Sequence, residues 1–292
     1  MTKSLPKITF KSRIELDIEV MTLSETYEKL TKIEDHNPFK AHKIQFYFIV
    51  VLTKGSYSHY VDFHFYDLKE GSILFIAKNQ VHHFIQNMQY AEGFCIIING
   101  QFFEQNYFLS KNVNLNRLYN YHLESPVIHQ EDIGEDDFVR IARRLYYEYN
   151  FPNSFLKGDM LRALLHVLLL KAERAKENKS ISSVKTQWLE TFSAFKNMLQ
   201  NEYVDTRSSR TYASKLFISY KLLNDIVKKL TGKTVKFFID DFVTMEIKRY
   251  LVSTSFSIKE ISYKTGFEEP ANMTKFFKKN TKKTPLQFRN QF

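Results

Sequence analysis

The sequence predicts an α+β protein: an N-terminal antiparallel β-barrel with a helical appendage, followed by an all-α C-terminal domain. Short runs rich in Ile, Val, Phe and Tyr, bounded by Gly, Asn, Lys or Ser, fill residues 43–98. Apolar residues recur with a helical period over residues 135–177, and the pattern from residue 186 onward is helical. A chain of 292 residues is long enough to give each domain its own core.

The strand-like region holds the candidates for a small-molecule pocket. Short strands with turn signals and no intervening helix favour an antiparallel sandwich or barrel. An apolar or aromatic effector would suit an interior with few polar groups, although each ring could equally be core filling. The runs are KIQFYFIVVL, SYSHYVDFHFYDL, GSILFIAKN and FCIIIN, and the candidate pocket residues are Phe46, Phe48, His59, Phe63 and His82.

Two apolar stripes mark the helices that follow the strands. The first consists of Phe138, Ile141, Ala142 and Leu145; the second consists of Leu161, Leu164, Leu165, Leu168 and Leu169. We expect the second stripe either to contact another subunit or to pack against its own barrel. The segment KAERAKENKSISS then loses all apolar periodicity and indicates a linker. The predicted domains are residues 1–177 and 186–292, with a linker at 178–185.

The positive charge is concentrated in the C-terminal domain. The chain has a net charge of +10, and residues 181–292 hold 20 Lys and Arg against 10 Asp and Glu, whereas residues 1–180 hold 22 of each. This asymmetry favours one module that binds a polyanion, with an ordinary solvated basic surface as the alternative.

Cysteine use and apolar runs predict a cytoplasmic protein. Cys95 is the single cysteine and lies in the apolar run FCIII, so we expect a buried small hydrophobe and no disulfide. The N-terminus is polar, and the longest apolar runs are too short to span a bilayer.

An internal repeat organises the C-terminal domain. KKLTGKT at residues 228–234 matches KKNTKKT at 278–284, an offset of 50, whereas Ala213 matches Ser262 at an offset of 49. One residue has therefore been gained in the turn between two paired helices. In the second copy, Gly266 suits a left-handed helix stop and Pro270 suits the first turn of the next helix. Each copy predicts a helix-turn-helix.

These residues resemble a known family. The segment from Ile258 to Arg289, with I-K-E-I-S, G-F, F-F-K-K and T-P-L-Q-F-R, resembles the signature of AraC/XylS-type transcriptional regulators. The first copy, from Ala213 to Gly232, resembles that family's other helix-turn-helix. EGSILFIAKNQVHHF is similar to its cupin-like sensor domain. The resemblance implies two helical subdomains joined by a long helix, here residues 239–254, an effector held in the barrel, and helices that pair two subunits.

The resemblance also implies DNA-contacting positions. The base-facing residues would be Lys221, Asn224, Ala271, Asn272 and Lys275, and the phosphate-binding residues would be Lys228, Lys278 and Lys279. The chain departs from the family pattern at four positions, with Asp225 and Val243 in place of arginine, Met273 in place of an aromatic residue and Lys282 in place of glycine. An acidic side chain in a recognition helix repels phosphates or selects the cytosine amino group.

The resemblance therefore implies a sequence-specific DNA-binding regulator. We expect a homodimer that binds double-stranded DNA and a small-molecule effector, and that acts through RNA polymerase if it is an activator. No cofactor, metal, membrane or enzyme activity is expected. Two alternatives stay open: a cupin metalloenzyme with a basic helical appendage, and a ligand-independent architectural DNA binder. Two features weaken the metalloenzyme alternative. The sequence lacks the usual H-x-H motif followed by glutamate at short spacing, and the neighbours His82 and His83 would face opposite sides of a strand.

Overall fold

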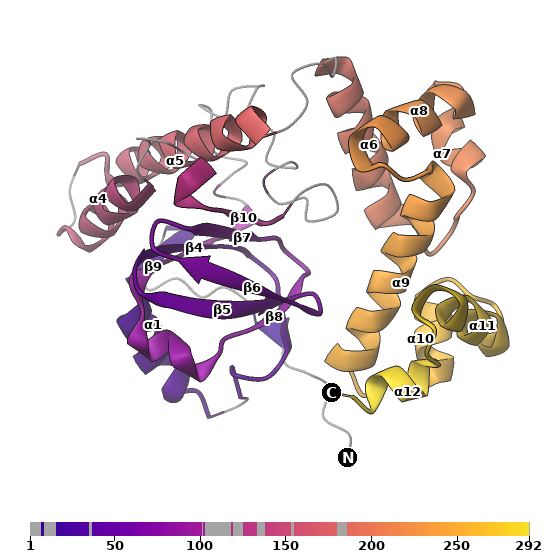
Figure 1. Ribbon diagram of the computed structural model, residues 1–292, viewed down its shortest axis with the longest axis horizontal. Helices are drawn as coiled ribbons and strands as arrows, with labels where there is room; N and C mark the ends of the chain where they lie inside the picture. The colour runs from indigo at the N-terminus through magenta and orange to yellow at the C-terminus, as the bar shows by residue number, and fades with distance from the viewer. Residues whose placement is uncertain are drawn as a thin grey trace. The chain divides into compact units, whose positions relative to one another are not determined.

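The computed structural model describes residues 7–8, 16–34, 37–100, 102, 118, 125–132, 138–152, 155–179 and 186–291. These residues form two compact units, an N-terminal unit up to residue 179 and a C-terminal unit from residue 186 (Figure 1). Residues 178 and 179 of the predicted linker are helical, and residues 180–185 lie outside the described residues. Within the described part of the chain, no helix is both long and apolar enough to cross a membrane.

The N-terminal unit is built from two five-stranded sheets (Figure 1). The strand orders are β1-β3-β8-β5-β6 and β10-β7-β4-β9-β2. Every pairing is antiparallel except that of β1 with β3, so the predicted antiparallel fold is confirmed with one parallel edge. The strands are β1 (Lys7–Ile8), β2 (Ile18–Thr22), β3 (His42–Ile44), β4 (Tyr47–Lys54), β5 (Ser56–Val61), β6 (His64–Lys69), β7 (Ile73–Ile76), β8 (Val81–His83), β9 (Glu92–Ile98) and β10 (Val127–Ile128).

The sequence run at residues 56–68 contains a hairpin. Asp62 and Phe63 both have positive φ, 44° and 73°, and Val61 pairs with His64 across the two-residue turn between β5 and β6. Such turns normally use Asn or Asp followed by glycine. The structure also adds a helix, α1 (Leu23–Thr31), which begins with a capping box between Thr22 and Glu25.

Two separate cores flank the second sheet, because successive residues of β4 point to opposite faces. Phe48, Val50 and Leu52 belong to the interior core shared by the two sheets. Ile49 and Val51 face the other way, toward the helices α4 (Phe138–Asn150) and α5 (Lys157–Lys179). The four leucines of α5 that are fully buried in this outer core are Leu161, Leu165, Leu168 and Leu169. The leucine stripe therefore packs against its own sheet, and the expectation of a subunit contact through it is wrong.

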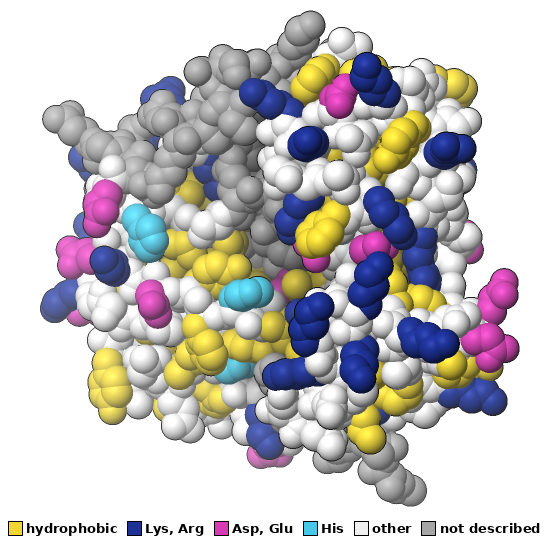
Figure 2. All heavy atoms as spheres, turned by 45° about the vertical axis from the view of Figure 1, so that its right-hand side comes forward, with side chains coloured by type: hydrophobic (Ala, Val, Ile, Leu, Met, Phe, Trp, Pro, Cys, Tyr) yellow, Lys and Arg dark blue, Asp and Glu magenta, His cyan; other side chains and the backbone are white. Residues whose placement is uncertain are grey.

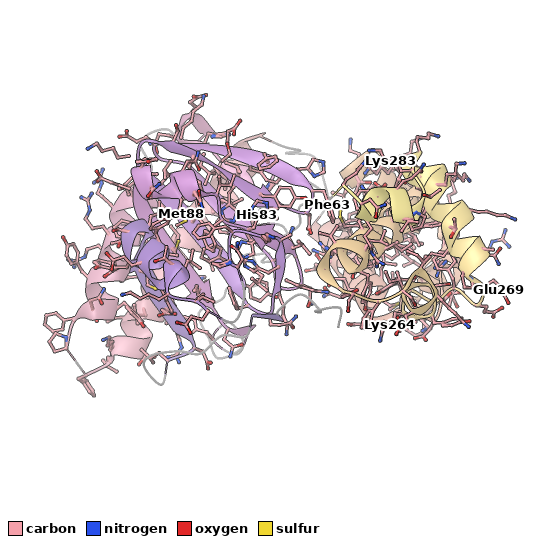
Figure 3. All side chains as sticks on the ribbon, turned by 90° about the horizontal axis from the view of Figure 1, so that it is seen from below. Phe63, His83, Met88, Lys264, Glu269 and Lys283 are labelled. Atoms are coloured by element: carbon pink, nitrogen blue, oxygen red, sulfur yellow. The ribbon has the colours of Figure 1, made fainter. Side chains whose placement is uncertain are left out.

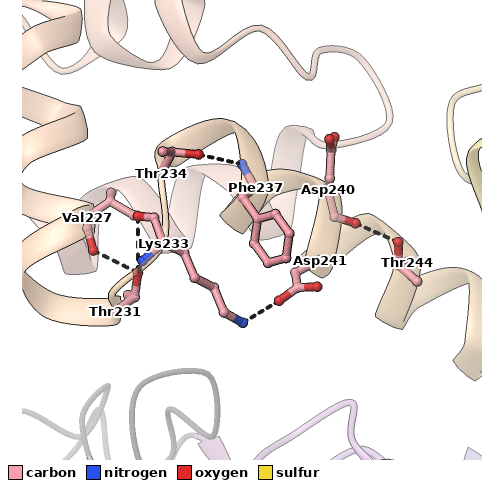
Figure 4. Close-up of polar contacts among 8 residues, drawn as sticks. All are labelled: Val227, Thr231, Lys233, Thr234, Phe237, Asp240, Asp241 and Thr244. Atoms are coloured by element: carbon pink, nitrogen blue, oxygen red, sulfur yellow. Dashed lines mark hydrogen bonds and ion pairs between the residues drawn. The ribbon is translucent and has the colours of Figure 1, made fainter. Parts of the chain in front are cut away.

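The described residues of the C-terminal unit form helices joined by short turns, with no strand among them (Figure 1). Its helices are α6 (Thr186–Glu202), α7 (Ser209–Lys215), α8 (Tyr220–Thr231), α9 (Val235–Ser253), α10 (Ile258–Lys264), α11 (Pro270–Thr281) and α12 (Pro285–Arg289). The long connecting helix is confirmed as α9, whose 19 residues extend for about 28 Å. It begins four residues before the predicted start because Thr234 caps it, accepting a hydrogen bond from the Phe237 N–H (Figure 4).

Candidate nucleic-acid interface

The structure confirms the internal repeat. Helices α7 and α10 each have seven residues, and α8 and α11 each have twelve. The first residues of α7 and α10 are 49 positions apart, whereas those of α8 and α11 are 50 apart. The additional residue therefore lies in the turn between α10 and α11. Each copy is a helix-turn-helix.

Helix α8 presents a charged face opposite its buried face. Ser219 caps the helix by accepting a hydrogen bond from the Leu222 N–H at 3.1 Å. Leu223, Ile226 and Val227 are buried, which leaves the opposite side of the helix in solvent. The exposed charged residues on that side are Lys221, Asp225, Lys228 and Lys229.

Helix α11 has the same construction with a more basic exposed face. Met273 and Phe277 are buried, and Pro270 occupies the first helical turn as predicted. Glu269 and Lys283 mark the two ends of the helix in Figure 3. Figure 2 shows Lys and Arg side chains spread over the viewer-facing surface of the C-terminal unit. The exposed residues of α11 that were predicted to contact DNA are Ala271, Asn272, Lys275, Lys278 and Lys279.

Asn224 makes a contact that its position in the sequence did not reveal. Its side-chain oxygen accepts a hydrogen bond from the Val235 N–H at 3.1 Å, at the start of α9. This satisfies one of the N–H groups that have no partner within that helix. The Asn224 oxygen is therefore engaged at the α8–α9 junction, and its amide nitrogen is the group left for a base contact.

The junction between α8 and α9 is fixed by local hydrogen bonds (Figure 4). The Thr231 hydroxyl donates to the Val227 carbonyl at 2.7 Å and accepts from the Lys233 N–H at 3.1 Å. Lys233 also forms an ion pair with Asp241 of α9. These contacts fix the turn that joins the end of α8 to the start of α9.

The signature arginine at the end of the chain has a structural role. Arg289 donates from Nε to the Leu251 carbonyl at 3.0 Å and from Nη2 to the Phe256 carbonyl at 2.6 Å. It thereby holds α12 against the C-terminal end of α9, where carbonyl groups lack helical partners. Arg289 consequently links α12, next to the second helix-turn-helix, to the end of α9.

Four of the five predicted pocket residues lie together inside the N-terminal unit. Phe46, Phe48, His59 and His82 are at most 7% exposed. His59 Nε2 and His82 Nδ1 are 3.0 Å apart, and the Tyr57 hydroxyl lies 3.1 Å from His59 Nδ1. The result is a short chain of polar groups within an apolar core.

Burial keeps these imidazoles neutral. Desolvation, followed by the charges of His83 and His42, lowers the pKa of His59 to about 3. Desolvation likewise places the pKa of His82 well below its usual value, with smaller contributions from His42, His59 and His83. A neutral imidazole donates one hydrogen bond and accepts one, and both nitrogens of His59 are engaged within this chain of polar groups.

Phe63 does not belong to this interior group. It occupies the β5–β6 turn, and its ring centroid lies 6.4 Å from that of Tyr60. Tyr60 follows His59 in the strand and stacks on His83, at 4.4 Å between centroids, so these rings lie on the opposite face of the sheet from His59 and His82. The predicted separation of His82 and His83 onto opposite faces is confirmed. The assignment of Phe63 to the interior pocket is wrong because the unrecognised turn reverses the strand.

Cys95 is fully buried, and desolvation raises the pKa of its thiol to about 12. Among the described residues, no three His, Cys, Asp or Glu side chains are arranged to hold a metal ion.

Two family models match the chain, one for each unit. The AraC-like ligand binding domain matches residues 30–107, and a helix-turn-helix domain matches residues 212–291. The chain belongs to the AraC family. Its N-terminal unit therefore contains an AraC-like ligand binding domain, and its C-terminal unit contains a helix-turn-helix domain.

Known proteins show similarity to parts of the chain. Histidine kinase P4 of Formosa agariphila is 28% identical over 114 residues, which are 39% of this chain and 8% of the kinase. The chain thus matches only a small part of that curated relative's length. The C-terminal domain of the response regulator yesN from Fusobacterium nucleatum is 25% identical over 34% of this chain and 98% of that structure, with a TM-score of 0.33. ToxT from Vibrio cholerae, with an unsaturated fatty acid bound, is 14% identical over 86% of this chain and 89% of its own, with a TM-score of 0.45.

Proposed function

We propose that this AraC-family protein is a cytoplasmic, dimeric activator that reads a two-block operator through α8 and α11 under the control of a small molecule. The observation that carries the proposal is the repeated amphipathic construction of the two helices. Each buries its apolar face in its own subdomain and exposes lysines on the opposite face. Activation would require contact with RNA polymerase.

We assign base contact to residues near the start of each recognition helix, where helix-turn-helix proteins touch base edges. Lys275 can donate to guanine, whereas Asp225, at the equivalent position of α8, can accept from the cytosine amino group. The two blocks therefore differ in sequence. The proposed base-facing residues are Lys221, Asn224, Ala271, Asn272 and Lys275, to which we add Asp225. The proposed phosphate-binding residues are Lys228, Lys278 and Lys279.

Selection of binding sites from random duplex DNA by the full chain tests this proposal. We expect an enriched motif with two unlike blocks about one helical turn apart. Salt-sensitive binding without enrichment would favour the architectural binder. Absence of binding, together with stoichiometric iron or zinc in the purified protein, would favour the metalloenzyme.

Lys275→Ala and Lys278→Ala form a matched pair of variants on one helix face. Lys275→Ala should relax preference at one base position and cost about 1–3 kcal/mol on the selected site. Lys278→Ala should weaken binding to all sequences and reduce the slope of log affinity against log salt by about one unit. If the two variants behaved alike, the orientation proposed for α11 would be wrong.

We place the effector site at the polar chain of Tyr57, His59 and His82. The site supplies two imidazoles within an apolar surrounding that includes Phe48 and Phe84. It therefore suits an apolar or aromatic compound with one polar group. A thermal-shift screen with the full chain should find such a compound, and His59→Phe should abolish its effect. A screen in which no small molecule stabilises the protein would count against a sensor role.

We place the dimer contact on the outer side of α5, away from the leucines that pack on the sheet. Met160, Val167 and Leu170 are 46%, 42% and 38% exposed, and Ala163 is also exposed. Their spacings alternate between three and four residues, which is the repeat that two helices need to pack along one another. Because one helix face that pairs with its own copy forms a closed two-fold contact, we propose a second chain as its occupant.

A further inference from the structure

Arg207 joins the two helix-turn-helix units of the C-terminal unit. It lies between α6 and α7, before the first unit, yet its Nη2 donates to the carbonyl of Thr265 in the turn of the second unit. Its guanidinium lies 3.5 Å from the ring centroid of Phe267 and 5.9 Å from that of Phe276. Phe276 is part of α11, so the contact reaches the second recognition helix itself.

A backbone approach reinforces this contact. Gly266, at φ +75°, lies so near Val204 that an added Cβ would be 2.1 Å from the Val204 oxygen. Val204 lies two residues after Glu202, the last residue of α6, and precedes Arg207 by three residues. The segment from 204 to 207 therefore packs on residues 265–267, which form the turn of the second unit. This junction is separate from the connection that α9 provides.

We propose that this junction, which we call the Arg207 clamp, fixes the separation and phase of α8 and α11, so that the protein recognises two DNA blocks only at one spacing. A guanidinium recognises a carbonyl and an aromatic face with defined geometry, unlike a lysine ammonium. Arg207 also lies outside residues 212–291, which match the helix-turn-helix model. The clamp is thus a positioning device added to the reading elements, and it rests on the proposed roles of α8 and α11.

DNA geometry makes the consequence measurable. One inserted base pair moves a block by about 3.4 Å and rotates it by about 34° around the duplex axis. A rigid pair of recognition helices cannot follow such a change, whereas a hinged pair can follow it in part. The clamp therefore predicts a steep dependence of affinity on the spacing between the blocks.

The test uses the full chain and duplexes that carry the selected blocks at their preferred spacing or with one or two base pairs added or removed. For the wild-type protein we expect each altered spacing to weaken binding by about 10-fold or more. Arg207→Ala should lose affinity at the preferred spacing but much less at altered spacings, so its profile flattens. Phe267→Leu, which removes the aromatic face without changing charge, should flatten the profile in the same direction. Arg210→Ala removes a nearby exposed arginine and should preserve the wild-type profile.

Three outcomes would overturn the clamp. The first is a flat wild-type profile. The second is an Arg207→Ala profile that drops equally at every spacing with a salt slope smaller by about one unit, because Arg207 would then be a phosphate contact. The third is a spacing profile that stays like the wild type for both Arg207→Lys and Phe267→Leu. These two variants also provide the test if thermal unfolding shows that Arg207→Ala does not fold. Failure of the proposed function is recognised separately, since the wild-type chain would then enrich no two-block motif.

Discussion

Lys282 occupies a backbone position that favours glycine. It ends α11 with φ of 64°, and the equivalent residue at the end of α8 is Gly232, with φ of 71°. A side chain in the left-handed region costs on the order of 1 kcal/mol. We predict that Lys282→Gly raises the free energy of unfolding by about 0.5–1 kcal/mol, as measured by chemical denaturation.

Gly232→Ala is the reciprocal control for that prediction. An added Cβ at Gly232 meets no atom within 4 Å, so only the backbone conformation opposes the substitution. We expect a loss of about 1 kcal/mol. Opposite signs for the two variants would establish the conformational cause, and a loss of stability in Lys282→Gly would contradict it.

Lys196 of α6 provides a prediction of pH dependence. It is 5% exposed, and burial lowers its pKa to about 7. Between pH 7 and 10 the unfolded chain therefore binds more protons at this residue than the folded chain, so its contribution to stability rises with pH, by at most about 1.4 kcal/mol per unit. Lys196→Met should remove that rise and stabilise the protein at pH 7, as followed by urea denaturation at pH 7.5, 8.5 and 9.5. Equal slopes for the variant and the wild type would contradict the shift.

Individual residues also show which contacts could be predicted from the sequence and which could not. The amphipathic pattern placed Lys275 and Lys278 on an exposed face correctly, because that inference needs only the helical period. The contacts of Asn224 with Val235 and of Arg207 with Thr265 join residues 11 and 58 positions apart. No local pattern encodes such pairs, since each depends on how separate helices pack.

At the scale of elements, periodicity identified the buried faces but not what covers them. The leucine stripe of α5 is buried as its spacing requires, yet whether a sheet or a second chain covers it depends on the tertiary fold. The β5–β6 turn escaped prediction because Asp-Phe replaces the Asn-Gly or Asp-Gly that normally marks such a turn. That one turn decided the side on which Phe63 lies.

Because histidines are buried between the two sheets, we predict that acid lowers the stability of the N-terminal unit. Their pKa values are lowered in the folded state, chiefly by desolvation, so folding favours the neutral forms of His59 and His82. This contribution is fully present above pH 6.5 and is lost as the pH falls from 6.5 toward 3. His59→Phe should therefore lessen the fall in melting temperature between pH 7 and pH 5, measured by circular dichroism. The exposed His64, changed to Gln, is the control and should leave that fall unaltered.

At the scale of the whole molecule, pairing of two chains would set how much DNA is bound. Two C-terminal units in a dimer can engage two operators at once, and the second binding event is then intramolecular. A charge in the proposed α5 contact would be desolvated without a partner, so Val167→Glu should dissociate the dimer. We expect sedimentation to show a monomer, with affinity for a paired operator reduced by at least 100-fold and affinity for a single operator unchanged. Lys171→Glu, at a half-buried residue one turn along but off the stripe, controls for charge. If Val167→Glu remained dimeric with a normal melting temperature, the contact would lie elsewhere on the molecule.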